Sequence, residues 1–154
     1  MPKTTMAGTY AIRFNGFARS DKASGKSYNL VGVGKLTLTK TSTTGSESGT
    51  ATGMHRSTLN PMTGMTDTTD RRHHTTYTYT NATYVVVDPG LPMVAEVTIT
   101  FQEQGGSRRM TDTLIAWQCG PDKFWLISSN PNDANGKVDE VVIGEAVKVD
   151  AATW

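Results

Sequence analysis

The chain has 154 residues, of which 36% are hydrophobic and 19% are charged, which is typical of one globular domain and excludes a disordered chain. Its formal net charge of +1 gives no general electrostatic reason to bind nucleic acid or an anionic membrane. The single cysteine, Cys119, excludes an intrachain disulfide framework. We therefore expect one domain over residues 1–154, with residues 1–7 disordered or loosely attached.

Membrane, targeting and cofactor motifs are not visible in the sequence. No apolar run approaches the roughly 18 residues of a spanning helix. The N-terminal residues lack the apolar segment of a signal peptide, which leaves the cytoplasm and export with a removed signal as alternatives. No phosphate-binding loop or nucleophile elbow is present, and we expect no cofactor.

The first two predicted strands show the alternation of a half-buried sheet. Residues 9–18 place Tyr10, Ile12 and Phe14 on one face. Residues 28–40 form the second strand, whose corresponding face is apolar at its ends and bare in the middle, where Gly32 and Gly34 lie. Glycines inside a strand mark a bend, a bulge or a close backbone approach.

The next strands are rich in threonine and β-branched residues. Residues 46–57 form the third, with small residues such as Ala51 and Gly53 on one side. Residues 72–87 form the fourth, dense in Thr, Tyr and Val, which fit a pleated surface. At about 3.3 Å per residue this segment is too long for one straight strand in a small domain, so we expect a bend near Asn81.

The fifth predicted strand, 93–102, has the cleanest alternation in the chain, with Ala95, Val97, Ile99 and Phe101 facing inward. The remaining strands are predicted at 108–119, 124–129 and 138–149. Both faces of 108–119 are equally apolar, so its inward face stays undecided. A slip of one residue would exchange the inward and outward sides of any strand.

These segments predict an all-β fold of about eight antiparallel strands joined by short connections. Strands that follow one another in this way can close into an up-and-down β-barrel, which removes the exposed sheet edges. The first strand would then pair with the eighth. A two-sheet β-sandwich is the alternative.

The chain resembles the calycins, the lipocalin-like small barrels, in residues 8–10 (Gly-Thr-Tyr) at the start of the first strand, where lipocalins carry Gly-x-Trp. It also resembles uncharacterised bacterial barrel proteins that begin Gly-Thr-Tyr and continue with a Gly-Val-Gly strand, here 32–34. Lys148 is the cation nearest to the position of the lipocalin arginine. The resemblance implies a barrel interior that holds one small apolar ligand. Allene oxide cyclase and dirigent barrels share this layout and use such an interior to steer cyclisations.

Aromatic side chains supply the candidate ligand site, because ligand pockets are mostly apolar and aromatic with few polar groups. The same rings could equally fill a closed core. We expect the following residues to line the interior and bind the ligand: Tyr10, Phe14, Tyr77, Tyr79, Phe101, Trp117 and Trp125.

Cations near strand ends could form a rim that binds the anionic head group of a ligand. Arg56, Arg72 and His74 are the candidates, and the alternative is that they only mark solvated strand ends. His55 could pair with His73 or His74 to hold a metal, but the spacing is not specific, so no metal site is predicted.

One carboxylate raises the possibility of catalysis. If Asp112 faces inward with Leu114 and Ala116, an apolar environment would raise its pKa and let it act as a general acid or base. We therefore keep three hypotheses. The first is a barrel that binds a small apolar or amphipathic molecule. The second is a cofactor-free cyclase or isomerase. The third is a filled barrel that forms oligomers, such as a homodimer, through exterior residues that include Val31, Val33, Tyr84 and Val86.

Overall fold

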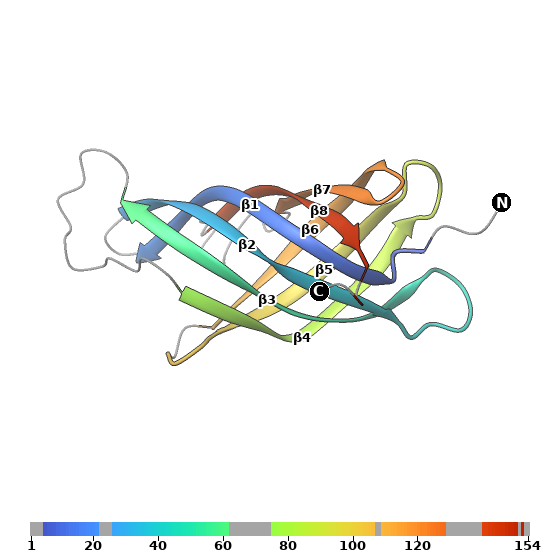
Figure 1. Ribbon diagram of the computed structural model, residues 1–154, viewed down its shortest axis with the longest axis horizontal. Coiled ribbons are helices and arrows are strands. Elements are labelled where there is room, and N and C mark those ends of the chain that lie inside the picture. Colours follow the sequence, from blue (N-terminus) through green and yellow to red (C-terminus); the bar gives the residue numbers. More distant parts are fainter. Residues whose placement is uncertain are drawn as a thin grey trace.

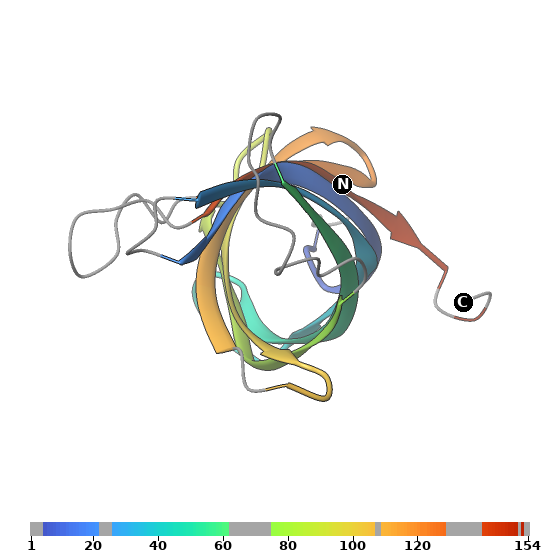
Figure 2. The same cartoon turned by 90° about the vertical axis from the view of Figure 1, so that its left-hand side faces the viewer.

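A computed structural model describes residues 5–21, 26–61, 75–106, 109–128, 140–150 and 152 of the chain. Eight strands form one closed antiparallel barrel in which each strand pairs with its neighbours in sequence, and β1 pairs with β8. Figure 1 shows the barrel from the side, and Figure 2 shows the ring of strands from one end. The predicted up-and-down barrel is confirmed, and the sandwich alternative is wrong.

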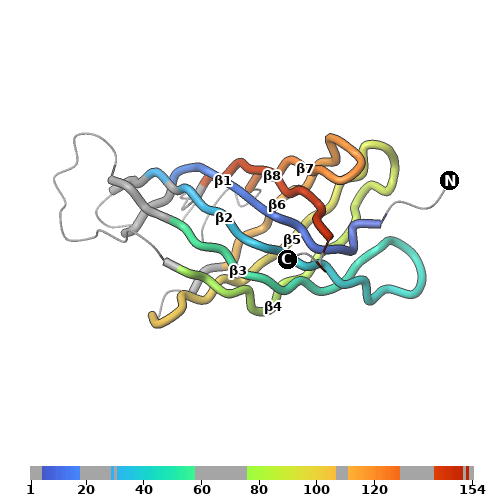
Figure 3. Tube along the Cα trace, in the orientation of Figure 1, coloured from blue at the N-terminus to red at the C-terminus, as the bar shows by residue number. Residues whose placement is uncertain are grey.

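Each predicted strand overlaps one observed strand, and Figure 3 traces them in order along the chain. The first and third strands extend beyond their predicted ends. The observed bounds are β1 Gly8–Asp21, β2 Lys26–Lys40, β3 Ser48–Pro61, β4 Thr75–Asp88, β5 Val94–Glu103, β6 Arg109–Gly120, β7 Lys123–Ser128 and β8 Glu140–Val149.

The interior is built from alternate residues, as the sequence predicts for the first and fifth strands. Tyr10 and Ile12 of β1 are buried, and so are the four alternating residues of β5, from Ala95 to Phe101. The structure also decides the orientation of β6. Asp112 pairs with the buried Ile99, and Ala116 is 1% exposed, so the even-numbered residues of β6 face the interior.

A bulge in β4 lies at the predicted bend. Asn81 has a left-handed backbone conformation with a φ of 49°, which asparagine tolerates better than most residues. The pairing of β4 with both neighbours shifts register there. As a result Tyr77 and Tyr79 face inward before the bulge, and Tyr84 and Val86 face inward after it. The expected exterior position of Tyr84 and Val86 is wrong because the extra residue changes the side of the sheet.

One end of the barrel is closed by the segment before β1. Met6 is 2% exposed, and its carbonyl accepts a hydrogen bond from the Tyr10 hydroxyl at 2.7 Å. Glu47 accepts hydrogen bonds from the amides of Met6 and Ala7 and from the hydroxyl of Tyr84. Residues 5–7 are therefore fastened to the barrel, and residues 1–4 of the segment expected to be loosely attached lie outside the described residues. We call this the closed end.

Candidate functional site

Four aromatic side chains surround a buried histidine inside the barrel. His55 of β3 is 5% exposed. Its ring centroid lies 5.0–5.5 Å from the centroids of four rings that come from β1, β4 and β5: Phe14, Tyr77, Tyr79 and Phe101. All four are among the seven predicted ligand-binding residues. The fold thus brings together rings that are far apart in the sequence, and we call His55 with these rings the interior cluster.

Two glycines of β2 make room for the interior cluster. A Cβ atom at Gly32 would collide with the ring of Phe14, and one at Gly34 would collide with the backbone of β3 at Met54 and His55. These are the two positions where the sequence shows a bare strand face. The close approach expected of glycines in a strand is present here, and it admits the imidazole and the phenyl ring.

The two ring nitrogens of His55 differ in their hydrogen bonding. Nδ1 lies 3.0 Å from the hydroxyl of Tyr79. Within the part of the chain that the structure describes, Nε2 has no hydrogen-bond partner, which is uncommon for a buried polar atom. Burial lowers the pKa of His55 to about 4, so the imidazole is neutral at physiological pH. Burial also raises the pKa of Tyr79, and the pair is therefore uncharged.

Two inward side chains are less completely covered than the rest of the interior. Tyr10, Tyr84 and Phe124, near the closed end, are 1–3% exposed, and the rings of Tyr10 and Phe124 pack edge to face. By contrast, Phe14 and Leu114 also point inward against the core but are only partly buried. The closed end is thus a filled core, whereas Phe14 and Leu114 are not fully covered by the side chains around them.

Asp112 lies on this inward side of β6, and it is partly buried. It takes part in an interaction with another residue. The structure therefore answers which way its strand faces, while a catalytic role for Asp112 stays a hypothesis.

The two tryptophans lie outside the barrel, so their predicted interior position is wrong. Trp117 and Trp125 pair directly across β6 and β7, and they are 49% and 59% exposed. The reason is strand parity: their neighbours Ala116, Phe124 and Leu126 take the inward positions. Sequence alone could not settle this, because both faces of these strands are apolar.

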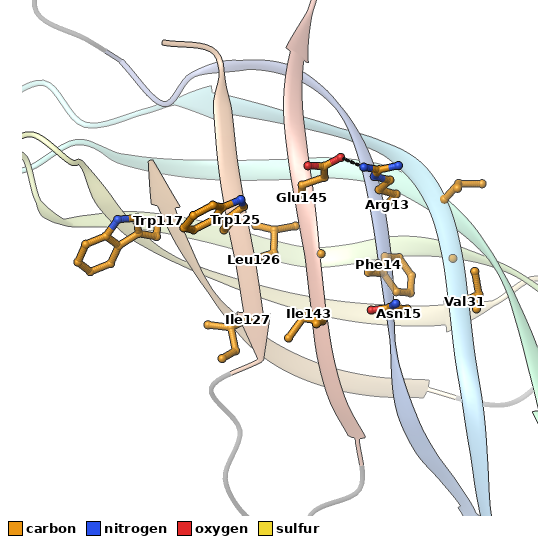
Figure 4. A pocket seen from close by; sticks show the side chains of 13 residues that line it. Arg13, Phe14, Asn15, Val31, Trp117, Trp125, Leu126, Ile127, Ile143 and Glu145 are labelled. Atoms are coloured by element: carbon orange, nitrogen blue, oxygen red, sulfur yellow. Dashed lines mark ion pairs between the residues drawn. The ribbon is translucent and has the colours of Figure 1, made fainter. Parts of the chain in front are cut away.

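Both tryptophans border a groove of about 730 Å³ on the outer surface. The strand register arranges its walls in two rows that cross β7, β8, β1 and β2. One row contains Trp125, Glu145, Arg13 and Val33, with Trp117 next to Trp125; the other contains Ile127, Ile143, Asn15 and Val31. Figure 4 shows these side chains and labels all of them except Val33. We call this feature the outer groove.

The predicted anion-binding rim is not assembled in the described residues. Arg56 is exposed on the outside of β3, opposite Val33, whereas Arg72 and His74 lie outside the described residues. In the described ranges no group of three or more His, Cys, Asp or Glu side chains could hold a metal, and no helix is long and apolar enough to cross a membrane. An anion-binding role for Arg56 stays a prediction.

The central residue of the interior cluster, His55, was considered in the sequence only as a metal ligand. Its position two residues after Gly53 places it on the same strand face as Ala51 and Gly53, which the sequence shows to be lined with small residues. This alternation was the signal that could have found it. Comparison of the chain with protein-family models, curated proteins and solved structures finds no match.

Proposed function

We propose that the barrel binds a small neutral molecule in its interior, next to the interior cluster. The ligand would have an apolar or aromatic body and one hydrogen-bonding group. The observation that carries this proposal is Nε2 of His55, a buried polar atom that has no partner among the described residues and lies among aromatic rings. A ligand atom bonded to Nε2 would remove the cost of leaving it unsatisfied, which is about 1–3 kcal/mol.

The His55–Tyr79 pair can serve either kind of hydrogen-bonding ligand. If the Tyr79 hydroxyl donates to Nδ1, then Nε2 carries the proton and donates to a ligand carbonyl or hydroxyl. In the other tautomer Nδ1 donates to Tyr79, and Nε2 accepts from a ligand hydroxyl or amine. A charged ligand group is disfavoured because the same desolvation that lowers the pKa of His55 would also penalise a buried ligand charge without a countercharge.

The location of the site follows from the packing inside the barrel. Small eight-stranded barrels are either filled by side chains or hold one small ligand, as lipocalins do. Here the closed end is filled, whereas the inward-facing Phe14 and Leu114 are only partly buried. We therefore place the ligand against Phe14, Leu114 and His55, in the manner that the calycin resemblance implies.

The test is native mass spectrometry on freshly purified protein, followed by denaturation and extraction, together with titration of a neutral naphthylamine fluorophore. We expect a retained molecule or saturable fluorophore binding at one site. His55→Leu removes the ring nitrogens, and Leu114→Trp fills the space beside Leu114 inside the barrel. Each variant should weaken binding by about tenfold or more.

The outer groove provides the matched control, because an apolar fluorophore could also bind there. Ile143→Asn changes the groove without touching the interior and should leave the affinity of the interior site unchanged. Loss of binding in Ile143→Asn but not in His55→Leu would overturn the proposal. A clean apo mass with no fluorophore binding in the wild-type protein would overturn it as well.

A second candidate function, a cofactor-free enzyme, is favoured by the inward orientation of Asp112. In that case the barrel would position a reactive substrate, and Asp112 would act as the acid or base. Once a ligand is identified, Asp112→Asn separates the two functions. A binding barrel would keep its affinity and show no turnover, whereas an enzyme would lose the rate at which it converts the bound molecule.

A further inference from the structure

The outer surface of the barrel has two unlike sides. On β3, β4 and β5 threonine is the commonest outward residue, and Met54, Val85 and Val87 are exposed among the threonines. On β7 and β8 the outward residues are mainly large and apolar, and β1 and β2 add Phe17, Val31 and Val33 among polar and charged residues. Single exposed apolar residues are normal on a protein surface, so the relevant observation is that these residues adjoin one another.

Cross-strand pairing brings most of these apolar residues together, while Asn15 and the Arg13–Glu145 ion pair lie between those of β8 and those of β2. Trp117 faces Trp125 across β6 and β7, Ile127 faces Ile143 across β7 and β8, and Val141 faces Phe17 across β8 and β1. These six residues are 46–59% exposed, and Val31 and Val33 on β2 are 51% and 60% exposed. Aromatic side chains measure roughly 150–250 Å² and Val and Ile somewhat less, so eight such residues that are about half exposed leave at most on the order of 800 Å² uncovered.

An area of this size is larger than the apolar patch of an ordinary monomer, which is about 300–600 Å². It is of the same order as the roughly 800 Å² that each partner contributes to a standard protein interface. We propose that the outer groove and its flanking residues form an isologous interface between two copies of this chain.

A second copy fits this surface in shape, because a two-fold interface places the same patch on both sides. Each copy presents a ridge, formed by Trp117 and Trp125, and a groove whose floor is the backbone at Gly32 and Gly144. The ridge of one copy can therefore enter the groove of the other. Both features lie on one side of the barrel, as such a dimer requires.

The charges of this side also suit a second copy. Glu145 forms ion pairs with Arg13 and with Lys123, so the charged residues within the first row already have partners within the same chain. The net charge of the whole chain is +1, and two copies therefore repel each other only weakly. These three residues carry only one excess positive charge, which gives a strongly acidic partner little to bind and a strongly basic partner nothing.

The test is sedimentation velocity of the full chain over a range of protein concentrations. We expect wild-type protein to sediment as a dimer that dissociates on dilution. Ile143→Asp and Val33→Asp place a charge on opposite walls of the groove, and each should weaken dimerisation by about tenfold or more. Both positions are exposed, so the variants should fold, which circular dichroism can check.

Thr83→Asp on β4 is the matched control, because it adds the same charge at an exposed position on the threonine side. It should leave dimerisation unchanged. A wild-type protein that remains monomeric at every concentration would overturn the proposal, and so would equal weakening by Thr83→Asp. A monomer whose fluorophore binding is lost in Ile143→Asp would assign the groove to a small apolar molecule instead.

Discussion

Two groups of aromatic residues lie on opposite sides of the same barrel wall. Phe14, Tyr77, Tyr79 and Phe101 surround His55 inside, whereas Trp117 and Trp125 lie outside beside Ile127. Aromatic side chains of neighbouring strands therefore have different roles, depending on the face of the sheet on which they lie. Inside they contact one another and stabilise the fold, and outside they are exposed to water and available for association. Strand parity, and not residue type, separates the two groups.

The largest expected effect is the difference in the free energy of unfolding between removing one ring of the inner group and removing one ring of the outer group. Phe101→Ala removes a side chain that is 7% exposed and packs on His55, Tyr77 and Tyr79, which should cost about 3–5 kcal/mol in the free energy of unfolding. Trp125→Ala removes a ring that is 59% exposed and should cost less than about 1 kcal/mol. Urea unfolding in dilute solution measures both values. Equal costs would contradict the inside–outside assignment.

The second effect concerns the dependence of stability on pH. The pKa of His55 is about 4 in the fold, compared with its ordinary value of 6.5. Between these values the unfolded chain binds a proton that the folded chain does not, so stability decreases as pH falls from 6.5 to 4. The total change is about 3 kcal/mol. Chemical unfolding at several pH values measures it.

His55→Phe is the control for this pH effect, because it keeps an aromatic ring and removes the titrating group. Its stability should vary less than that of the wild type between pH 6.5 and 4. Burial would raise the pKa of Glu47, but its hydrogen bonds outweigh burial and lower the pKa below the ordinary 4.5. Protonation of Glu47 therefore adds a loss of stability only below about pH 4.5. Parallel pH curves for wild type and His55→Phe would show that His55 does not titrate as described.

The smallest expected effect concerns Gly34, whose missing side chain allows the backbone of β3 to approach closely next to the interior cluster. Gly34→Ala adds a methyl group that would collide with the backbone of β3 and should destabilise the fold by about 1–3 kcal/mol. Gly120→Ala is the matched change, because its Cβ would meet Lys123 at an ordinary 3.6 Å. That variant should be neutral or more stable by up to about 1 kcal/mol. Thermal unfolding would contradict this view if Gly34→Ala were the milder change.

Much of the barrel could be predicted from the sequence, because alternation is a local property. Tyr10, Ile12 and Phe14 share a face in the sequence and do so in the structure, and the same holds for the alternating residues of β5. Four of the seven proposed ligand-binding residues meet around His55. Tyr10 is also interior, but it packs against Phe124 near the closed end.

The failures have specific physical causes. The predicted interior position of Trp117 and Trp125 fails because β6 and β7 are apolar on both faces, so alternation does not choose between the faces. The predicted exterior position of Tyr84 and Val86 fails because a single extra residue at Asn81 reverses the orientation of everything that follows in β4. The sequence does not show the ring cluster of His55, because its four ring contacts come from strands distant in the sequence.

The sequence by itself determined the fold class, the approximate positions of the strands and the bend near Asn81. Strand propensity, turn residues and period-two alternation act over a few residues and can be read directly from the chain. Only the tertiary structure decided which face of β6 and β7 is inward and which rings surround His55. It also decided that exposed apolar side chains of β6, β7, β8 and β2 line one outer groove. These properties depend on how eight strands align with one another when the barrel closes, and that alignment is a property of the whole chain.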